Sequence, residues 1–254
     1  MQVIDATADL PAGKVFYRDS GGAGVPVVFL HAASGNSMLW KFQIPAFTGA
    51  GYRFIALDHR ATARGSNSSA LLAGLLAKLH IERCHLLGTA AGGGAALQFA
   101  LAHPQKVSSL VIANSIGFVL DREYLDMSNR IRPAPQFAEL PLEFRELGPS
   151  YRAADAAGEA CWLALSRQGQ QSAGAQTKDG GNAEVTWAGL ESLKIPALLL
   201  TGDADLYTPP SVLRMFTARM PQAESAVIAE TGHSSYWENP QAFNATVLAF
   251  LRKH

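Results

Sequence analysis

Cysteine is scarce in this chain of 254 residues. The two cysteines, Cys84 and Cys161, lie far apart, and neither a CxxC pair nor a His/Cys cluster at metal-ligand spacing accompanies them. The sequence therefore predicts no disulfide framework and no metal site, and we expect no other cofactor. Because unpaired cysteine is among the most buried residue types, we expect both thiols to lie in the core.

An excess of charge of one sign is missing as well. The Lys and Arg residues number 21 and the Asp and Glu residues number 21, so no long-range field draws nucleic acid or an anionic membrane to the surface. Such a balance suits an enzyme that acts on small molecules, with no nucleic-acid partner. The sequence does not indicate an oligomeric state.

Long apolar runs are the third absence. No run approaches the roughly 18 residues that a transmembrane helix needs, and residues 1–5 lack the basic and apolar regions of a signal peptide. We therefore expect a cytoplasmic protein with no membrane partner. Apolar residues nevertheless make up 48% of the chain, which is enough for a sheet covered on both faces.

What the sequence does contain is a regular alternation of short apolar runs and helical stretches. Residues 25–30 form a nearly continuous apolar run, as expected for a strand buried on both faces. Similar strand-like runs occupy residues 14–17, 54–57, 85–87, 110–113, 197–201 and 225–228. Helical patterns occupy residues 69–79, 93–102, 211–220 and 240–253. This alternation predicts a doubly wound α/β domain with a mostly parallel sheet.

The alternation breaks at residues 117–188. This stretch contains four prolines, a helical pattern at residues 153–167 and a polar, Gly-rich part at residues 168–182. An insertion between two core strands is typical of a lid over a site, and it can also be an excursion that covers apolar surface. We therefore divide the chain into a core of residues 1–116 and 189–254 and a helical lid of residues 117–188.

A Gly-rich turn joins a strand to a helix at residues 86–94, LLGTAAGGG. This is the context of a nucleophile elbow, in which G-x-S-x-G places a side chain on a sharp strand-to-helix turn. The glycines at 88 and 92 permit the close approach of neighbouring backbone, and the middle residue is Ala90. A turn of this kind can also cradle phosphate, but the stretch matches neither the Walker A loop nor GxGxxG.

Three further loops follow predicted strands. One strand ends at His31 and leads through small residues to Trp40. A second leads to the acid loop at residues 202–209, GDADLYTP, in which Asp205 is the candidate acid and Asp203 its competitor. A third leads to a Gly-His loop that carries His233. A lone loop histidine is more often structural, but the order elbow, Asp, His is that of a known catalytic arrangement.

These motifs resemble those of the α/β-hydrolase fold family, over nearly the whole chain outside residues 117–188. The resemblance implies a serine-type mechanism, in which the imidazole of His233 takes a proton from the nucleophile and Asp205 fixes its tautomer. Ala90 stands at the position of the nucleophile. The N–H groups of Ala33 and Ala91 are expected to face the developing oxyanion.

Aromatic residues of the lid favour a small apolar or aromatic substrate, although such rings are more often lid core than pocket wall. They are Phe118, Phe137, Phe144, Tyr151 and Trp162. We expect the substrate to contact His31, Trp40 and Trp162. The lid also carries arginines that could hold a carboxylate, for which a solvated face is the favoured interpretation: Arg130, Arg132, Arg145 and Arg152.

The chain departs from the family at the nucleophile. Ala90 has no lone pair with which to attack a carbonyl, and the side chain of Thr89 should point to the other face of the strand. Ser108 and Ser109 lie beyond the following helix, out of register. An engineered Ser→Ala change and a natural loss of the serine both explain Ala90, and the intact acid and histidine favour the first.

Two smaller departures lie near the site. The family usually has glycine after the histidine of the strand that ends at His31, where this chain has Ala32. It also typically shows D-x-R-G-x-G-x-S where this chain has Ala61 and Ala63. We expect the rim of the site to be rearranged there.

Three hypotheses follow. In the leading one, the chain is a serine-type hydrolase scaffold for an ester, a lactone or an activated C–C bond, and Ala90→Ser restores activity. In the second, His233 and Asp205 abstract a proton from the substrate with Ala90 in place, an arrangement that resembles the cofactor-independent dioxygenases of this fold. In the third, the protein binds a ligand without turnover.

Overall fold

A single sheet of eight strands organises the chain. The structure is a computed structural model that describes residues 3–59, 67–115, 117, 119–171 and 184–254. The strands run β1-β2-β4-β3-β5-β6-β7-β8 across the sheet. Their bounds are β1 Ile4–Leu10, β2 Gly13–Asp19, β3 Pro26–Leu30, β4 Arg53–Leu57, β5 Cys84–Thr89, β6 Val107–Ala113, β7 Ala197–Gly202 and β8 Glu224–Ile228.

The sheet is parallel from β4 to β8, and β1 and β2 add antiparallel strands at one edge. This confirms the predicted doubly wound, mostly parallel architecture, and each predicted strand corresponds to an observed one. The sequence pattern missed β1, because Ala8 is its one buried residue and the strand has no continuous apolar run.

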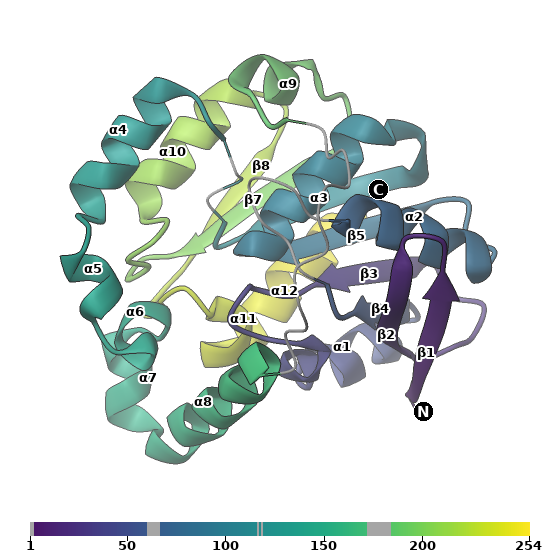
Figure 1. Cartoon of the computed structure of the whole chain (residues 1–254), viewed down its shortest axis with the longest axis horizontal. Helices are drawn as coiled ribbons and strands as arrows, with labels where there is room; N and C mark the ends of the chain where they lie inside the picture. Colours follow the sequence, from purple (N-terminus) through teal and green to yellow (C-terminus); the bar gives the residue numbers. More distant parts are fainter. Residues whose placement is uncertain (1–2, 60–66, 116, 118, 172–183) are drawn as a thin grey trace.

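Helices cover both faces of the sheet (Figure 1). On one face, α2 (Ser68–Lys78), α3 (Ala91–Ala102), α9 (Trp187–Ser192) and α10 (Pro210–Arg219) pack over a first hydrophobic cluster. On the other face, α1 (Gln43–Gly49), α12 (Pro240–Leu251), the short α11 (Ser235–Glu238) and a 3-10 helix (Ser37–Trp40) pack over a second. Successive residues of a strand point to opposite faces, so Leu86 of β5 enters the first cluster and Leu87 the second.

Between β6 and β7 the chain forms a run of helices along the side of the molecule away from the β1–β2 hairpin (Figure 1). They are α4 (Arg122–Ile131), α5 (Gln136–Glu139), α6 (Leu142–Glu146), α7 (Pro149–Ala154) and α8 (Ala156–Gln171). The predicted helix at residues 153–167 falls mostly in α8, after a break at Asp155. We refer to these helices as the lid helices; the division into a core and a lid at residues 117 and 188 stays a prediction.

The prediction that both cysteines are buried is half wrong. Cys84 is buried at the start of β5, whereas Cys161 is exposed on α8, because that helix turns only part of its surface toward the core. Ala61, Ala63 and Phe118 lie outside the described residues, as does most of the predicted Gly-rich loop. None of the helices in the described segments has the length and apolar character needed to cross a membrane.

Candidate active site

Ala90 occupies the sharp turn between β5 and α3. Its backbone has φ 50° and ψ −119°, a conformation that L-residues rarely adopt. Two glycines make the turn possible: a Cβ on Gly88 would lie 2.2 Å from the carbonyl oxygen of Gly92, and a Cβ on Gly92 would lie 2.1 Å from that of Leu30. The Oγ of Ser115 also donates to the Ala90 carbonyl at 2.6 Å. The turn therefore has the sharp strand-to-helix geometry that is typical of a nucleophile elbow, with a methyl group at its tip.

Asp205 is fully buried in the loop after β7, and both of its carboxylate oxygens accept hydrogen bonds. The donors include the backbone N–H of Tyr207 at 2.8 Å and both the N–H and the hydroxyl of Thr208, at 2.9 and 2.6 Å. Burial alone would raise the pKa of Asp205, but His233 and the bonds from Thr208 outweigh burial and hold that pKa well below its usual range. Asp205 is thus an anion built into the fold.

His233 lies in the loop after β8, 4% exposed, with its Nδ1 at 2.9 Å from Asp205. Burial would lower the pKa of His233, but the Asp205 carboxylate outweighs it and raises that pKa. Because Nδ1 faces the carboxylate, Nε2 is the nitrogen that can exchange a proton with a substrate. The structure thus brings together Asp205 and His233, while Asp203 is exposed.

Asn114 is a site residue that the sequence analysis missed. It follows β6, is fully buried with φ 47°, and donates through Nδ2 to Asp205 at 3.0 Å and to the Gly232 carbonyl at 3.1 Å. It therefore ties the acid loop to the histidine loop. Its position in the sequence could have indicated this role. A polar residue directly after a parallel strand lies at the same sheet edge as the acid loop and the histidine loop.

The two expected oxyanion donors come from adjoining backbone segments. Ala91 is the first residue of α3, so its N–H is one of the helix N-terminal groups that lack an acceptor within the helix. Ala33 is exposed in the loop after β3. The close approach of Gly92 to Leu30 places the start of α3 against the end of β3. The oxyanion role of both N–H groups stays a prediction.

Comparison with known proteins gives one family. A family model described as alpha/beta hydrolase fold matches residues 25–240. The chain belongs to the α/β-hydrolase fold family. A 2-hydroxy-6-oxononadienedioate/2-hydroxy-6-oxononatrienedioate hydrolase of Burkholderia vietnamiensis is 29% identical, over 94% of this chain and 91% of the relative. A pimeloyl-[acyl-carrier protein] methyl ester esterase of Aeromonas hydrophila is 28% identical, over 91% of this chain and 96% of the relative. The crystal structure of naproxen esterase from Bacillus subtilis shares the fold, with a TM-score of 0.76 and 21% identity over 98% of this chain and 92% of that one.

The predicted substrate contacts of this α/β-hydrolase are all buried. The indole of Trp40 packs in the second hydrophobic cluster, with ring centroids 5.1 Å from Phe29 and 4.8 Å from Tyr236. Trp162 is fully buried in the same cluster. His31, at 3% exposure, faces the Ala32 carbonyl through Nδ1 and accepts from the His59 N–H through Nε2. In the described conformation these rings are closed off from solvent, and their contact with a substrate stays a prediction.

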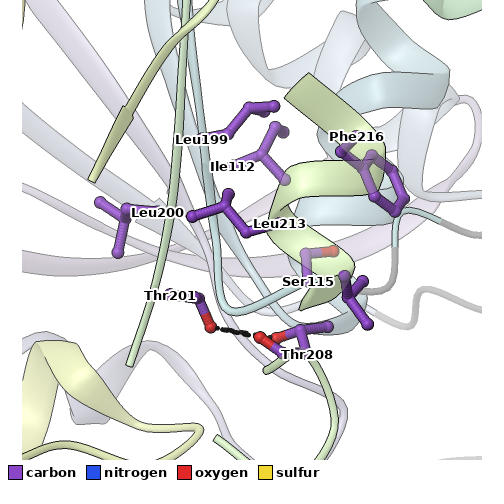
Figure 2. A pocket seen from close by; sticks show the side chains of 9 residues that line it. Ile112, Ser115, Leu199, Leu200, Thr201, Thr208, Leu213 and Phe216 are labelled. Carbon is purple, nitrogen blue, oxygen red and sulfur yellow. Dashed lines mark hydrogen bonds between the residues drawn. The ribbon is translucent and has the colours of Figure 1, made fainter. Parts of the chain in front are cut away.

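A small pocket lies behind the acid loop, between β6, β7 and α10 (Figure 2). Its apolar wall includes Ile112, Leu199, Leu213 and Phe216. Its polar wall is made by the groups that hold the site in place: Ser115, Thr201 and Thr208. Thr201 donates to the Thr208 carbonyl at 2.6 Å and to Asp205 at 3.1 Å. The pocket is therefore bordered by residues that donate hydrogen bonds to Asp205 and to the Ala90 carbonyl.

The lid helices touch the histidine loop directly at the link between α6 and α7. A Cβ on Gly148 would lie 2.8 Å from the backbone nitrogen of Gly232. Glu238 joins the two segments, because its carboxylate accepts from Gly148 N–H at 2.7 Å, Gly232 N–H at 2.9 Å and Ser234 N–H at 3.2 Å. We call this arrangement the Glu238 clamp. Burial raises the pKa of Glu238 to about 7, although its three backbone donors oppose the rise.

Glu146, the last residue of α6, is a second acid of the site that the sequence analysis missed. It is 6% exposed, and its Oε2 has no hydrogen-bond partner among the described residues. Burial raises the pKa of Glu146, while the charge of His233 lowers it and that of Asp205 raises it. Helix α6 therefore places a carboxyl group within electrostatic reach of the His233–Asp205 pair. No spacing in the sequence signals this, since the contact depends on how α6 docks.

Proposed function

We propose that this chain has the architecture of a Ser-His-Asp hydrolase for esters, lactones or activated C–C bonds of small apolar or aromatic molecules, with Ala90 at the position of the nucleophile. The observation that supports this most is the backbone of Ala90. Holding an L-residue in that conformation lowers the free energy of unfolding by about 1–3 kcal/mol. The methyl group of an alanine forms no hydrogen bond that would offset this loss. The conformation serves a side chain that must project from the turn.

The chemistry with a serine at position 90 follows from the neighbouring groups. The Nε2 of His233 would take the hydroxyl proton while the oxygen attacks the carbonyl, and Asp205 would stabilise the imidazolium. The N–H groups of Ala33 and Ala91 would hold the oxyanion. With Ala90 the acyl-enzyme cannot form, so the chain as it stands binds its substrate without this turnover.

The relatives support the reaction class. They include a hydrolase of 2-hydroxy-6-oxononadienedioate and a methyl ester esterase, each matching more than nine-tenths of this chain. An acyl substrate that is attacked at a carbonyl carbon fits both the site and these names. We therefore propose a small-molecule substrate and no nucleic-acid or membrane partner.

The test is a paired assay of this chain and its Ala90→Ser variant on p-nitrophenyl esters and vinylogous diketones. We expect turnover with a burst from Ala90→Ser alone, and loss of that activity in the double variant Ala90→Ser/His233→Ala. Inactivity of Ala90→Ser on the whole panel, with the fold intact by circular dichroism, would contradict the proposal.

A second candidate is proton abstraction without a covalent step, and Glu146 is the observation that favours it. A buried carboxyl that interacts electrostatically with His233 supplies a second proton-exchanging group to a site without a nucleophile. This function predicts that the chain with Ala90 is already active in the same assay and that His233→Ala abolishes the activity. Activity of the Ala90 chain that His233→Ala leaves unchanged would contradict it.

A further inference from the structure

Two lid arginines converge on Tyr207, next to His233. Arg132 directly follows α4 as its C-cap residue, and Arg145 belongs to α6. The guanidinium carbon of Arg132 lies 5.8 Å from the centre of the Tyr207 ring, and the Nη1 of Arg145 donates to the Tyr207 hydroxyl at 3.3 Å. The Tyr207 ring in turn lies against His233, with centroids 4.3 Å apart. Separate parts of the lid thus place two positive charges beside the catalytic pair.

Each guanidinium group has a hydrogen-bond acceptor among the described residues, Ser128 for Arg132 and Tyr207 for Arg145, and each leaves its Nε donor unpaired there. The Nε atoms of Arg132 and Arg145 are buried, and neither has a hydrogen-bond partner among the described residues. Neither side chain makes an ion pair within the described part of the chain, whereas Arg53 pairs with Asp19 at 2.6 Å. A buried donor without a partner costs about 1–3 kcal/mol, and more when it is charged. The cost of these two donors is removed when an anion reaches them.

Glu146 follows Arg145 directly, and the positive charge of Arg145 acts on its carboxyl group without a close ion pair. No ion pair of Glu146 occurs among the described residues, and its Oε2 is unpartnered. Burial raises the pKa of its carboxyl, whereas the charge of Arg145 and a hydrogen bond with Tyr207 lower it. Because no ion pair joins Glu146 to either arginine within the described residues, both guanidinium groups remain available to an anionic ligand.

We propose that Arg132, Arg145 and Tyr207 form a subsite for a carboxylate group of the substrate. The substrate would then carry a free carboxylate at one end and the scissile carbonyl at the other, within reach of His233. Guanidinium groups bind carboxylates through charge-assisted, often bidentate hydrogen bonds. Phe137, whose ring meets Tyr207 edge-on at 4.9 Å, supplies an apolar wall for the part between. The scissile carbonyl rests on the proposed hydrolase function; the carboxylate subsite by itself does not.

The test is calorimetric titration of the chain with Ala90, which binds esters without forming an acyl-enzyme. The probes are the monomethyl esters of the linear diacids from succinic to suberic acid, each compared with its dimethyl ester. We expect at least one monoester to bind about tenfold or more tightly than its neutral diester, as one charged hydrogen bond provides. Equal or weaker binding of every monoester overturns the subsite.

Variants locate the effect. Arg132→Gln and Arg145→Gln should each remove most of the preference for the monoester, while Arg132→Lys and Arg145→Lys should retain part of it. Arg130→Gln is the matched control, because it removes one exposed charge from α4, two residues before Arg132. If Arg130→Gln reduces the preference as much as the other two, the effect is long-range and the subsite is refuted.

The two proposals fail separately. Turnover of neutral esters by Ala90→Ser, with no preference for the monoester in the titration, retains the hydrolase and refutes the subsite. A clear preference in the titration, with an inactive Ala90→Ser variant, retains the subsite and refutes the hydrolase.

Discussion

At the scale of single residues, Ala90 has a strained backbone at the turn between β5 and α3. Position 90 has φ 50°, and it is held there by close approaches at Gly88 and Gly92. The strain of about 1–3 kcal/mol is larger than the extra entropy, about 0.5–1 kcal/mol, that a glycine loses on folding. The methyl group of Ala90 therefore lowers the stability of the chain relative to a glycine at position 90.

Ala90→Gly should consequently raise the free energy of unfolding by about 1 kcal/mol, measured by urea denaturation. Ala91→Gly is the control: it lies one residue further, in α3, and should lower stability by up to about 1 kcal/mol. A destabilised Ala90→Gly variant would mean that position 90 is not strained.

At the scale of elements, the Glu238 clamp decides how the lid helices meet the histidine loop. Three backbone N–H groups point at one carboxylate, and the backbones of Gly148 and Gly232 are in contact. A glutamine at position 238 offers one acceptor and turns an NH₂ group toward the remaining donors. The fold cannot relax around this mismatch, because the glycine contact leaves no room.

Glu238→Gln should therefore lower the free energy of unfolding by about 1–3 kcal/mol and speed hydrogen exchange at the amides of Gly148 and Gly232. Glu139→Gln, at an exposed position of α5, should change neither quantity. Unchanged exchange at both glycines in Glu238→Gln would show that the clamp does not hold the lid.

At the scale of the whole molecule, the Asp205–His233 pair makes the free energy of unfolding depend on pH. The lowered pKa of Asp205 contributes stability above about pH 4, and this is lost as the pH falls. The raised pKa of His233 contributes stability below about pH 6.5, and this is lost as the pH rises through the raised value. Both contributions are present together between about pH 4 and 6.5.

The destabilisation caused by Asp205→Asn should accordingly be largest near about pH 5.5 and smaller at pH values on either side, as measured by thermal or urea unfolding across the range. Asp203→Asn, on the same loop and exposed, is the control and should show a flat difference. A difference for Asp205→Asn that grows steadily into alkaline solution would contradict the ion pair.

The sequence predicted those features that depend on local pattern. Strands buried on both faces have continuous apolar runs, and the elbow, acid and histidine loops follow such strands at readable spacings. Residues that matter through tertiary contact had no such signal: Glu146 and Glu238 act through the docking of the lid, and β1 is an edge strand. The lid arginines were expected on a solvated face, but the Nε atoms of Arg132 and Arg145 are buried.

The most direct test of the central claim, that the site is a Ser-His-Asp hydrolase without its nucleophile, is covalent labelling with a fluorophosphonate followed by mass spectrometry. We expect no adduct on this chain, one adduct at position 90 in Ala90→Ser, and none in Ala90→Ser/His233→Ala. An unlabelled Ala90→Ser protein, or equal labelling with and without His233, would contradict it.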